Sequence, residues 1–402
     1  MTQAVVSFRS VPKILNLFQR TTLATLHWIP HFTSVINWTQ RLGLAMLDQV
    51  SPITTPWFAI IDLSIDVGVK KALVVLRVPA ESLKQRGSAV CLEDCECIGL
   101  KIMEKVNGET ISAELTDIFA TAGMPVAVVK DGGTDLKKGI RLWHEAQNQS
   151  EKIYQIEDIG HFMSNALQAA FSSQKRYHRF VKIASTGAAR LRQTKLAFLV
   201  PPKLRAKGRF QSIGKLGQWA EKILQVFSKK GLAANGSTLQ KLRIAMGGLS
   251  LLKPFLLRFA STLKIVSQVW EILKKEGLTQ STYNQSKNLA EQLPKRSKVK
   301  SRLLGWLDRH IEVQSSLQIE HPLLVSSDII ESLFGKFKYI IERSPQADMG
   351  LSALVLPALC GKINGVVIDL AIKNTVHRDL KVWEQKNIPY TLRKQRMAFF
   401  SE

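Results

Sequence analysis

Long apolar runs, cysteine motifs and acidic residues are all scarce in this sequence, and each scarcity excludes a class of protein. No stretch of about 18 uncharged apolar residues occurs, which excludes an ordinary transmembrane helix. Residues 1–20 lack an apolar core followed by a small-residue cleavage site, so we expect no secretory signal peptide. These absences predict a soluble protein of the cytoplasm without a membrane partner.

Cysteine supplies neither a zinc motif nor a disulfide framework. The first three cysteines have the spacing C-x3-C-x-C, which matches neither the paired C-x-x-C of zinc sites nor a disulfide pattern. We therefore expect free thiols in a reducing compartment and no metal bound to cysteine. The four cysteines are Cys91, Cys95, Cys97 and Cys360.

Acidic residues number 32 against 56 lysines and arginines, which gives a formal net charge of +24. Residues 161–320 carry 29 basic and 7 acidic residues, a net charge of +22, whereas the remainder carries 27 and 25. A surplus of this size predicts a polyanionic partner, and nucleic acid is favoured over an anionic membrane surface. Because this surplus of basic residues is confined to the middle of the chain, we expect the flanking regions to have a different function.

The sequence does contain a regular alternation of short apolar runs and turn signals between residues 57 and 160. Five runs predict strands, and they begin at Trp57, Lys70, Cys97, Met124 and Lys152. The first two flank a short turn with Gly68 and are predicted to form a hairpin. Helical spacing after the third and the fourth run completes the predicted order of strand, strand, strand, helix, strand, helix, strand.

Helices are predicted for the remainder of the chain. Residues 161–320 show helical spacing with basic faces, and a further helix is predicted at about 328–342. The tryptophans of the middle region are predicted in helix cores, and the alternative is that one of them stacks on a flipped base. These tryptophans are Trp219, Trp270 and Trp306.

The chain is thereby divided into four regions. Residues 1–56 are a helical segment, in which 32–47 fits either a helix-turn-helix remnant that reads DNA or a plain helical cap. The other three regions are 57–160, 161–320 and 321–402, and the last of these ends in a basic tail.

Acidic residues at strand ends and on helices are candidate metal ligands, because carboxylates beside phosphates weaken binding unless they hold a metal. Asp62 interrupts the first apolar run, Asp131 ends the fourth run before two glycines, and Glu331 begins the helix near 328. Each has a structural alternative. Asp62 can be paired with an arginine or a backbone donor, Asp131 can begin a turn or cap a helix, and Glu331 can close a capping box with Asp328. Asp66 is interpreted as a turn residue.

Together, these acids and the element order resemble the DDE transposases, whose catalytic domain has an RNase H-like fold. The segments WFAIIDLSIDVGVKKALVVL, VAVVKDGGTDLKKGI and IIESLFGKFK are similar to a group of bacterial insertion-sequence transposases. The similarity covers residues 57–160 and about 321–362. It implies an α/β core with a mixed five-stranded sheet and flanking helices, interrupted by a large all-helical basic insertion.

The resemblance also implies an activity. It implies an enzyme that binds insertion-sequence ends and catalyses DNA cleavage and strand transfer with two Mg²⁺ ions, for which Mn²⁺ can substitute. Asp62, Asp131 and Glu331 would be the catalytic metal ligands. The partners would be double-stranded DNA, both transposon ends and target, and further copies of the chain in a homodimer or higher homo-oligomer. The bacterial cytoplasm, at the nucleoid when DNA is bound, would be its location.

Five further residues are singled out around these acids. Asp158 and His161 match the C/D-x-x-H element of several eukaryotic cut-and-paste families, which implies an accessory role in the site. The alternative for His161 is an ordinary histidine at a helix start. Lys336, Lys338 and Arg343 follow Glu331 on or just past the same helix and are predicted to contact DNA phosphates.

Other functions stay open at this point. An inactive, transposon-derived DNA-binding protein would share the basic region, and retained metal binding would separate it from an enzyme. A structure-specific nuclease with the same RNase H-like core would cut DNA without joining it. A membrane-surface protein is disfavoured because the basic helices lack a large apolar face.

Overall fold

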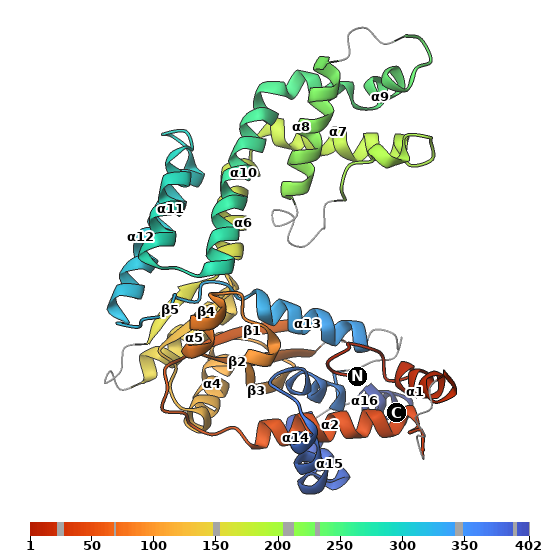
Figure 1. Ribbon diagram of the computed structural model, residues 1–402, viewed down its shortest axis with the longest axis vertical. Helices are drawn as coiled ribbons and strands as arrows, with labels where there is room; N and C mark the ends of the chain where they lie inside the picture. The colour runs from red at the N-terminus through yellow and green to blue at the C-terminus, as the bar shows by residue number, and fades with distance from the viewer. Residues whose placement is uncertain are drawn as a thin grey trace. The chain divides into compact units, whose positions relative to one another are not determined.

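The computed structural model describes residues 1–21, 28–67, 70–147, 153–203, 213–229, 234–341, 349–388 and 392–401. The chain divides into two compact units, each seen in Figure 1. The sheet unit consists of Met1–Asp158 and Glu320–Glu402, and the helical unit consists of Ile159–Ile319.

The sheet unit is built on a five-stranded sheet with the strand order β3-β2-β1-β4-β5. Strands β1 to β3 pair antiparallel, whereas β4 runs parallel to β1 and β5 runs parallel to β4. The strands are β1 (Trp57–Val67), β2 (Lys70–Pro79), β3 (Glu96–Met103), β4 (Ala127–Lys130) and β5 (Tyr154–Glu157). This order and these directions are those of the RNase H-like fold, so the predicted fold class is confirmed.

The first five residues of the central strand β1 form a continuous apolar run because both faces of the strand are covered there. Residues 57–61 are at most 1% exposed. On one face, α4 (Gly108–Ala122) and α5 (Thr134–Ala146) cover the sheet, and the rings of Phe119 and Trp143 lie 4.5 Å apart in this core. The helical spacing predicted for these two segments therefore follows from the apolar face that they bury.

A helix from the C-terminal part of the chain also packs against β1. This helix, α13 (Asp328–Ile341), buries Ile330, Leu333 and Phe337 (Figure 1). Its bounds match the helix predicted at 328–342, and it brings a segment from the far end of the sequence to the central strand.

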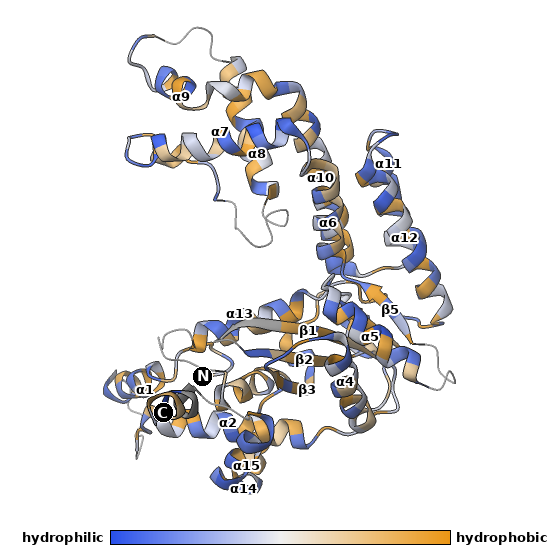
Figure 2. Cartoon of the chain, turned by 180° about the vertical axis from the view of Figure 1, so that it is seen from behind, coloured by the Kyte–Doolittle hydropathy of each residue, from blue (hydrophilic) through white to orange (hydrophobic). Residues whose placement is uncertain are grey.

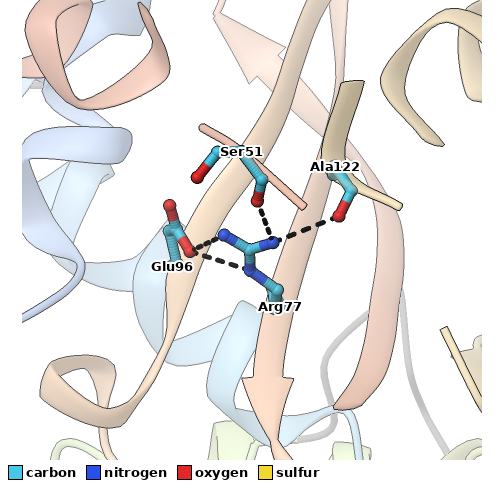
Figure 3. A network of polar contacts seen from close by, with 4 residues as sticks. All are labelled: Ser51, Arg77, Glu96 and Ala122. Carbon is cyan, nitrogen blue, oxygen red and sulfur yellow. Dashed lines mark hydrogen bonds and ion pairs between the residues drawn. The ribbon is translucent and has the colours of Figure 1, made fainter. Parts of the chain in front are cut away.

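A buried arginine joins the sheet to its flanking segments (Figure 3). Arg77 of β2 is 3% exposed, and its guanidinium donates hydrogen bonds to the Glu96 carboxylate on β3, with Nε at 2.8 Å. It also donates to the carbonyl oxygens of Ser51 at 2.8 Å and Ala122 at 3.2 Å. One side chain thereby connects two strands, the loop before β1 and the end of α4.

Helix α2 (Phe32–Asp48) is held in the sheet unit by the segment that follows α13. It packs against η4 (Leu351–Val355), η5 (Pro357–Leu359) and α14 (Gly365–Asn374). A Cβ atom on Gly43 would lie 1.8 Å from the carbonyl oxygen of Leu354, so only glycine permits this approach of α2 to η4. Residues 32–47 therefore pack closely within the sheet unit, and the choice between a helical cap and a helix-turn-helix remnant stays a prediction.

The remaining elements of the sheet unit are short. They are α1 (Ser10–Thr21), α3 (Ala80–Arg86), η1 (Leu92–Asp94), α15 (His377–Asn387) and α16 (Leu392–Ser401).

The helical unit consists of helices around an aromatic core. They are α6 (Ile159–Phe171), α7 (Lys175–Leu191), η2 (Ala197–Leu199), α8 (Ile213–Lys229), α9 (Thr238–Met246), η3 (Gly247–Leu252), α10 (Lys253–Glu276), α11 (Gln280–Glu291) and α12 (Lys298–Ser316). Figure 2 shows hydrophobic and hydrophilic positions interspersed along α10, whose Phe259 is fully buried and lies 4.8 Å from the Phe171 ring.

Two helical runs of the sequence are shorter in the structure than their periodicity indicates. The run across Ser172 divides into α6 and α7, and the run that ends at Glu276 begins as the 3-10 helix η3 before α10 starts at Lys253, with Pro254 in its first turn. Proline is tolerated in the first turn of a helix, where its missing N–H has no intrahelical acceptor. None of the helices in the described ranges is long and apolar enough to span a membrane.

Candidate active site

Three aspartates lie side by side on neighbouring strands: Asp62 within β1, Asp131 directly after β4 and Asp158 directly after β5. Ile61 of β1 pairs with Lys130, the last residue of β4, and Lys130 pairs with the last residue of β5. Asp62, Asp131 and Asp158 are the next residues of the three strands. The amide of Asp158 donates to the carbonyl oxygen of Lys130 at 3.0 Å, so the parallel hydrogen-bonding pattern continues into this aspartate row.

The aspartate row lies on the face of the sheet opposite α4 and α5. Ala59 and Ile61 of β1 point into the core beneath these helices, and side chains alternate between faces along a strand. Asp62 therefore points to the opposite face. Residues in register on neighbouring strands share a face, so Asp131 and Asp158 belong to the same face as Asp62.

The third aspartate connects this face to the helix that carries Glu331. The Asp158 carboxylate accepts hydrogen bonds from the backbone amide of Ser327 at 2.7 Å and from its hydroxyl at 3.0 Å. Asp158 is 2% exposed and Ser327 is 3% exposed. Because Ser327 directly precedes α13, the helix begins on the face of the aspartate row. Sequence reasoning missed Ser327, although a serine before a helix is a recognised start signal.

The other two aspartates each accept a hydrogen bond from a nearby backbone amide. An oxygen of Asp62 lies 2.7 Å from the amide nitrogen of Leu63, and an oxygen of Asp131 lies 2.7 Å from that of Gly133. The contact between Asp131 and the Gly133 amide is an Asx turn. The interpretation of Asp131 as a turn residue therefore accounts for this contact. Both carboxylates are partly exposed, unlike that of Asp158.

Glu331 is exposed and lies in the first turn of α13. Asp328 is the first residue of this helix, three positions before Glu331, and the capping-box interpretation of this pair stays a prediction. Lys336 and Lys338 follow on the same helix and are partly exposed, whereas Arg343 lies outside the described residues.

The remaining candidates from the sequence are His161 and Asp66. His161 is the third residue of α6 in the helical unit and is partly exposed. The Asp66 side chain belongs to the part of β1 whose side chains the structure does not describe. Gly68, in the turn of the predicted hairpin, lies outside the described residues.

The three acids proposed from the sequence fit a magnesium site by their chemistry and their backbone placement. Carboxylate oxygens are the hard ligands that Mg²⁺ prefers, and neighbouring strands place Asp62 and Asp131 about 4.7–4.9 Å apart. Across the described ranges, however, no group of three or more acidic, histidine or cysteine side chains has the geometry to hold a metal ion.

Sequence reasoning also missed a buried lysine beside the aspartate row. Lys130 is 6% exposed, and its ammonium donates to the side-chain oxygen of Gln155 on β5. Burial lowers the pKa of Lys130 to about 8, with a smaller lowering from Lys137 and an opposing effect of Glu157. Its position after a run of apolar residues is the one signal that the sequence offers.

Basic side chains cover one helix of the helical unit without acidic neighbours on that helix. Helix α7 has no acidic residue, and five basic residues on it are exposed. They are Lys175, Arg176, Arg179, Lys182 and Arg190. Such a surface can bind phosphates without carboxylate repulsion.

The tryptophans of the helical unit all have contacts within it. Trp306 is fully buried, the Trp219 indole donates to the Leu199 carbonyl at 3.1 Å, and the Lys274 ammonium lies 4.8 Å from the Trp270 ring centre. These contacts support the helix-core interpretation, most directly for Trp306.

Comparisons with known proteins give a structural likeness but no match in sequence. No family model matches the sequence, and no curated protein matches it. Among solved structures, the Drosophila P element transposase strand transfer complex is 12% identical, covers 91% of this chain and 92% of its own, and has a TM-score of 0.45. Neither this identity nor this TM-score assigns the chain to a family.

Proposed function

We propose that this protein is a DDE transposase of a bacterial insertion sequence that binds the ends of its element, cleaves DNA and joins it to a target. The observation that carries the proposal is the aspartate row of an RNase H-like sheet. In this row, Asp131 directly follows the carboxyl end of β4, where open α/β sheets bind their ligands, and Asp62 lies beside it within the adjacent parallel strand β1. The helix that carries Glu331 begins on the same face.

In this proposal, Asp62, Asp131 and Glu331 hold the metal ions. Two Mg²⁺ ions, or Mn²⁺ in their place, would supply an activated water or 3′-hydroxyl and relief of charge on the leaving oxygen. Asp62 lies on the central strand of the sheet, which gives it a rigid support.

The basic surfaces would bind DNA around this site. The helical unit, with the exposed cations of α7, would hold the transposon end through its phosphates. Lys336, Lys338 and Arg343 would contact the strand next to Glu331, with Asp158 and His161 as accessory residues. Processing two ends in one reaction requires two sites, so we expect a homodimer or a higher homo-oligomer.

The test is a cleavage and joining assay on labelled DNA that carries the ends of the element, with Mg²⁺ or Mn²⁺ added. We expect wild-type protein to nick and join, and Glu331→Gln to lose at least about a hundredfold in both, as for removal of one essential catalytic group. DNA binding by the variant should be unchanged. Glu145→Gln is the matched control, because this acid is also on a helix of the sheet unit and its side chain is 60% exposed. Equal cleavage by Glu331→Gln and wild type would contradict the proposed site.

A DNA-binding protein derived from such an enzyme is the second candidate. It is favoured by the exposed cations of α7, which can bind phosphates whether or not the acids hold a metal. Salt-sensitive DNA binding without cutting, together with no Mn²⁺ bound to the wild-type protein, would establish it. Metal-dependent nicking without joined products would instead indicate a structure-specific nuclease.

A further inference from the structure

Asp158 differs from the other two residues of the aspartate row in being buried. A buried carboxylate is unfavourable unless hydrogen bonds replace its water. Oδ2 of Asp158 receives both the amide hydrogen bond and the hydroxyl hydrogen bond of Ser327, at 2.7 and 3.0 Å. Ser327 and its neighbour Ser326 are only 3% and 4% exposed, so these contacts lie in a buried polar cluster.

The two partners of this contact are each fixed to a different element. On one side, the amide of Asp158 donates to the Lys130 carbonyl at the end of β4. On the other side, Ser327 lies at the N-terminus of α13, where amides lack partners within the helix and a carboxylate is favoured by the helix dipole. The carboxylate therefore joins the sheet edge directly to the start of α13.

Chain connectivity alone does not position α13 on the sheet. Asp158 and Ser327 are 169 residues apart in sequence, and the whole helical unit lies between them. Apolar contacts of α13 with β1 are non-directional, so they tolerate small shifts along the helix axis. A hydrogen bond to the first turn is directional and fixes that shift.

We infer that Asp158 is a positioning residue, which anchors the N-terminus of α13 and thereby places Glu331 opposite Asp62 and Asp131. Glu331 follows Ser327 by one helical turn, so a displacement at Ser327 is transmitted to it. The inference rests on the proposed function, because it concerns Glu331 as a metal ligand. It assigns Asp158 to the helix anchor and not to the metal.

Two substitutions at Asp158 separate these roles. Asparagine keeps one carbonyl oxygen, which can accept both hydrogen bonds of Ser327, whereas alanine removes the acceptor. We expect Asp158→Asn to retain metal-dependent cleavage within about tenfold of wild type, since it loses only the charge of the bond. Asp158→Ala should lose about a hundredfold, the usual effect of a small misplacement in a catalytic site. A metal ligand would lose activity in both variants, as Glu331→Gln does, and this result would overturn the inference.

A milder variant covers the case in which Asp158→Ala fails to fold. Ser327→Ala removes the hydroxyl hydrogen bond and keeps the amide hydrogen bond. We expect it to need more Mg²⁺ for half-maximal cleavage, with DNA binding unchanged, because Glu331 is less well placed. A lower melting temperature with an unchanged Mg²⁺ requirement would show a structural role only, and would contradict the positioning role.

Hydrogen exchange provides a measurement that does not depend on activity. The amides of residues 329–333 should exchange faster in Asp158→Ala and Ser327→Ala than in Asp158→Asn or wild type. Asp379→Ala is the control, because Asp379 accepts a 2.7 Å hydrogen bond from the Val376 amide at the start of α15 in the same unit. It should leave cleavage and α13 exchange unchanged. If wild type never cuts DNA but exchange follows this pattern, the proposed function is wrong and the helix anchor stands; unchanged exchange in Asp158→Ala would refute the anchor.

Discussion

At the scale of single residues, the three aspartates occupy equivalent positions in the strand register but differ in burial. Asp62 and Asp131 are partly exposed and bond to neighbouring backbone amides, whereas Asp158 is buried and bonds to a distant helix. Solvent access is needed to exchange a backbone partner for an ion, so the exposed pair suits metal binding and the buried one suits anchoring.

The cysteines provide a residue-scale prediction about reactivity. Burial raises the pKa of Cys95 and of Cys97 to about 12, and raises that of Cys360 well above its usual value, whereas Cys91 is partly exposed. Thiolate is the reactive form, and at pH 8 a pKa of about 12 leaves roughly one thiol in 10⁴ ionised. We expect iodoacetamide to modify Cys91 first in the native protein and the other three only after unfolding. Mass spectrometry of the peptides gives the order, and native labelling of Cys97 at the rate of Cys91 would contradict it.

At the scale of elements, the Arg77 network predicts a large loss of stability on truncation. Arg77→Met leaves the Glu96 carboxylate without its buried partner and removes the donor from the Ser51 and Ala122 carbonyls. We expect the free energy of unfolding of the sheet unit to fall by about 3–5 kcal/mol, measured by urea denaturation. The control is Arg141→Met, whose ion pair with Glu145 is exposed on both sides. This control should cost less than about 1 kcal/mol, and equal losses would show that burial is not the cause.

Replacing glycine by alanine is expected to have opposite effects at Gly43 of α2, which lies against η4, and at Gly335 of α13. In Gly43→Ala, the new Cβ would meet the Leu354 carbonyl oxygen at 1.8 Å, so the backbones must separate. We expect a loss of about 1–3 kcal/mol, as for other overpacked sites, although alanine favours helix. Gly335→Ala on α13 meets no atom within 4 Å and should gain up to about 1 kcal/mol. Thermal denaturation compares the two, and a stabilised Gly43→Ala would contradict the close approach.

At the scale of the whole molecule, the uneven charge predicts where salt sensitivity originates. The full-length chain is expected to bind double-stranded DNA with an affinity that falls steeply with salt, and each lost phosphate contact lowers the slope of log K against log salt by about 1. Neutralising Lys175, Arg179 and Lys182 to glutamine on one face of α7 should lower the slope by up to about 3.

The control for this prediction carries the same charge change in the sheet unit. Lys362, Lys381 and Lys386 are also exposed, and their replacement by glutamine should leave the slope nearly unchanged. The two triple variants are compared by fluorescence anisotropy over a salt series. An equal decrease in both would show that net charge, and not the α7 surface, governs binding.

The sequence by itself determined the elements, because strand and helix periods are local properties of neighbouring side chains. Alternating apolar runs predicted the five strands, and the carboxylates were identified because charge is unexpected in or after such runs. The charge surplus of residues 161–320 was equally visible, and it nearly coincides with the helical unit Ile159–Ile319. The break between α6 and α7 near Ser172 was not visible in the sequence, since the apolar spacing continues across it.

Only the tertiary structure decided which residues meet. Strand register placed Asp62, Asp131 and Asp158 in one row, the Ser327 contact attached α13 to that row, and Gly43 proved to be a packing residue against Leu354. Each of these relations joins segments that are distant in the chain. They depend on hydrogen bonding and packing between elements, which the local side-chain pattern of either partner does not encode.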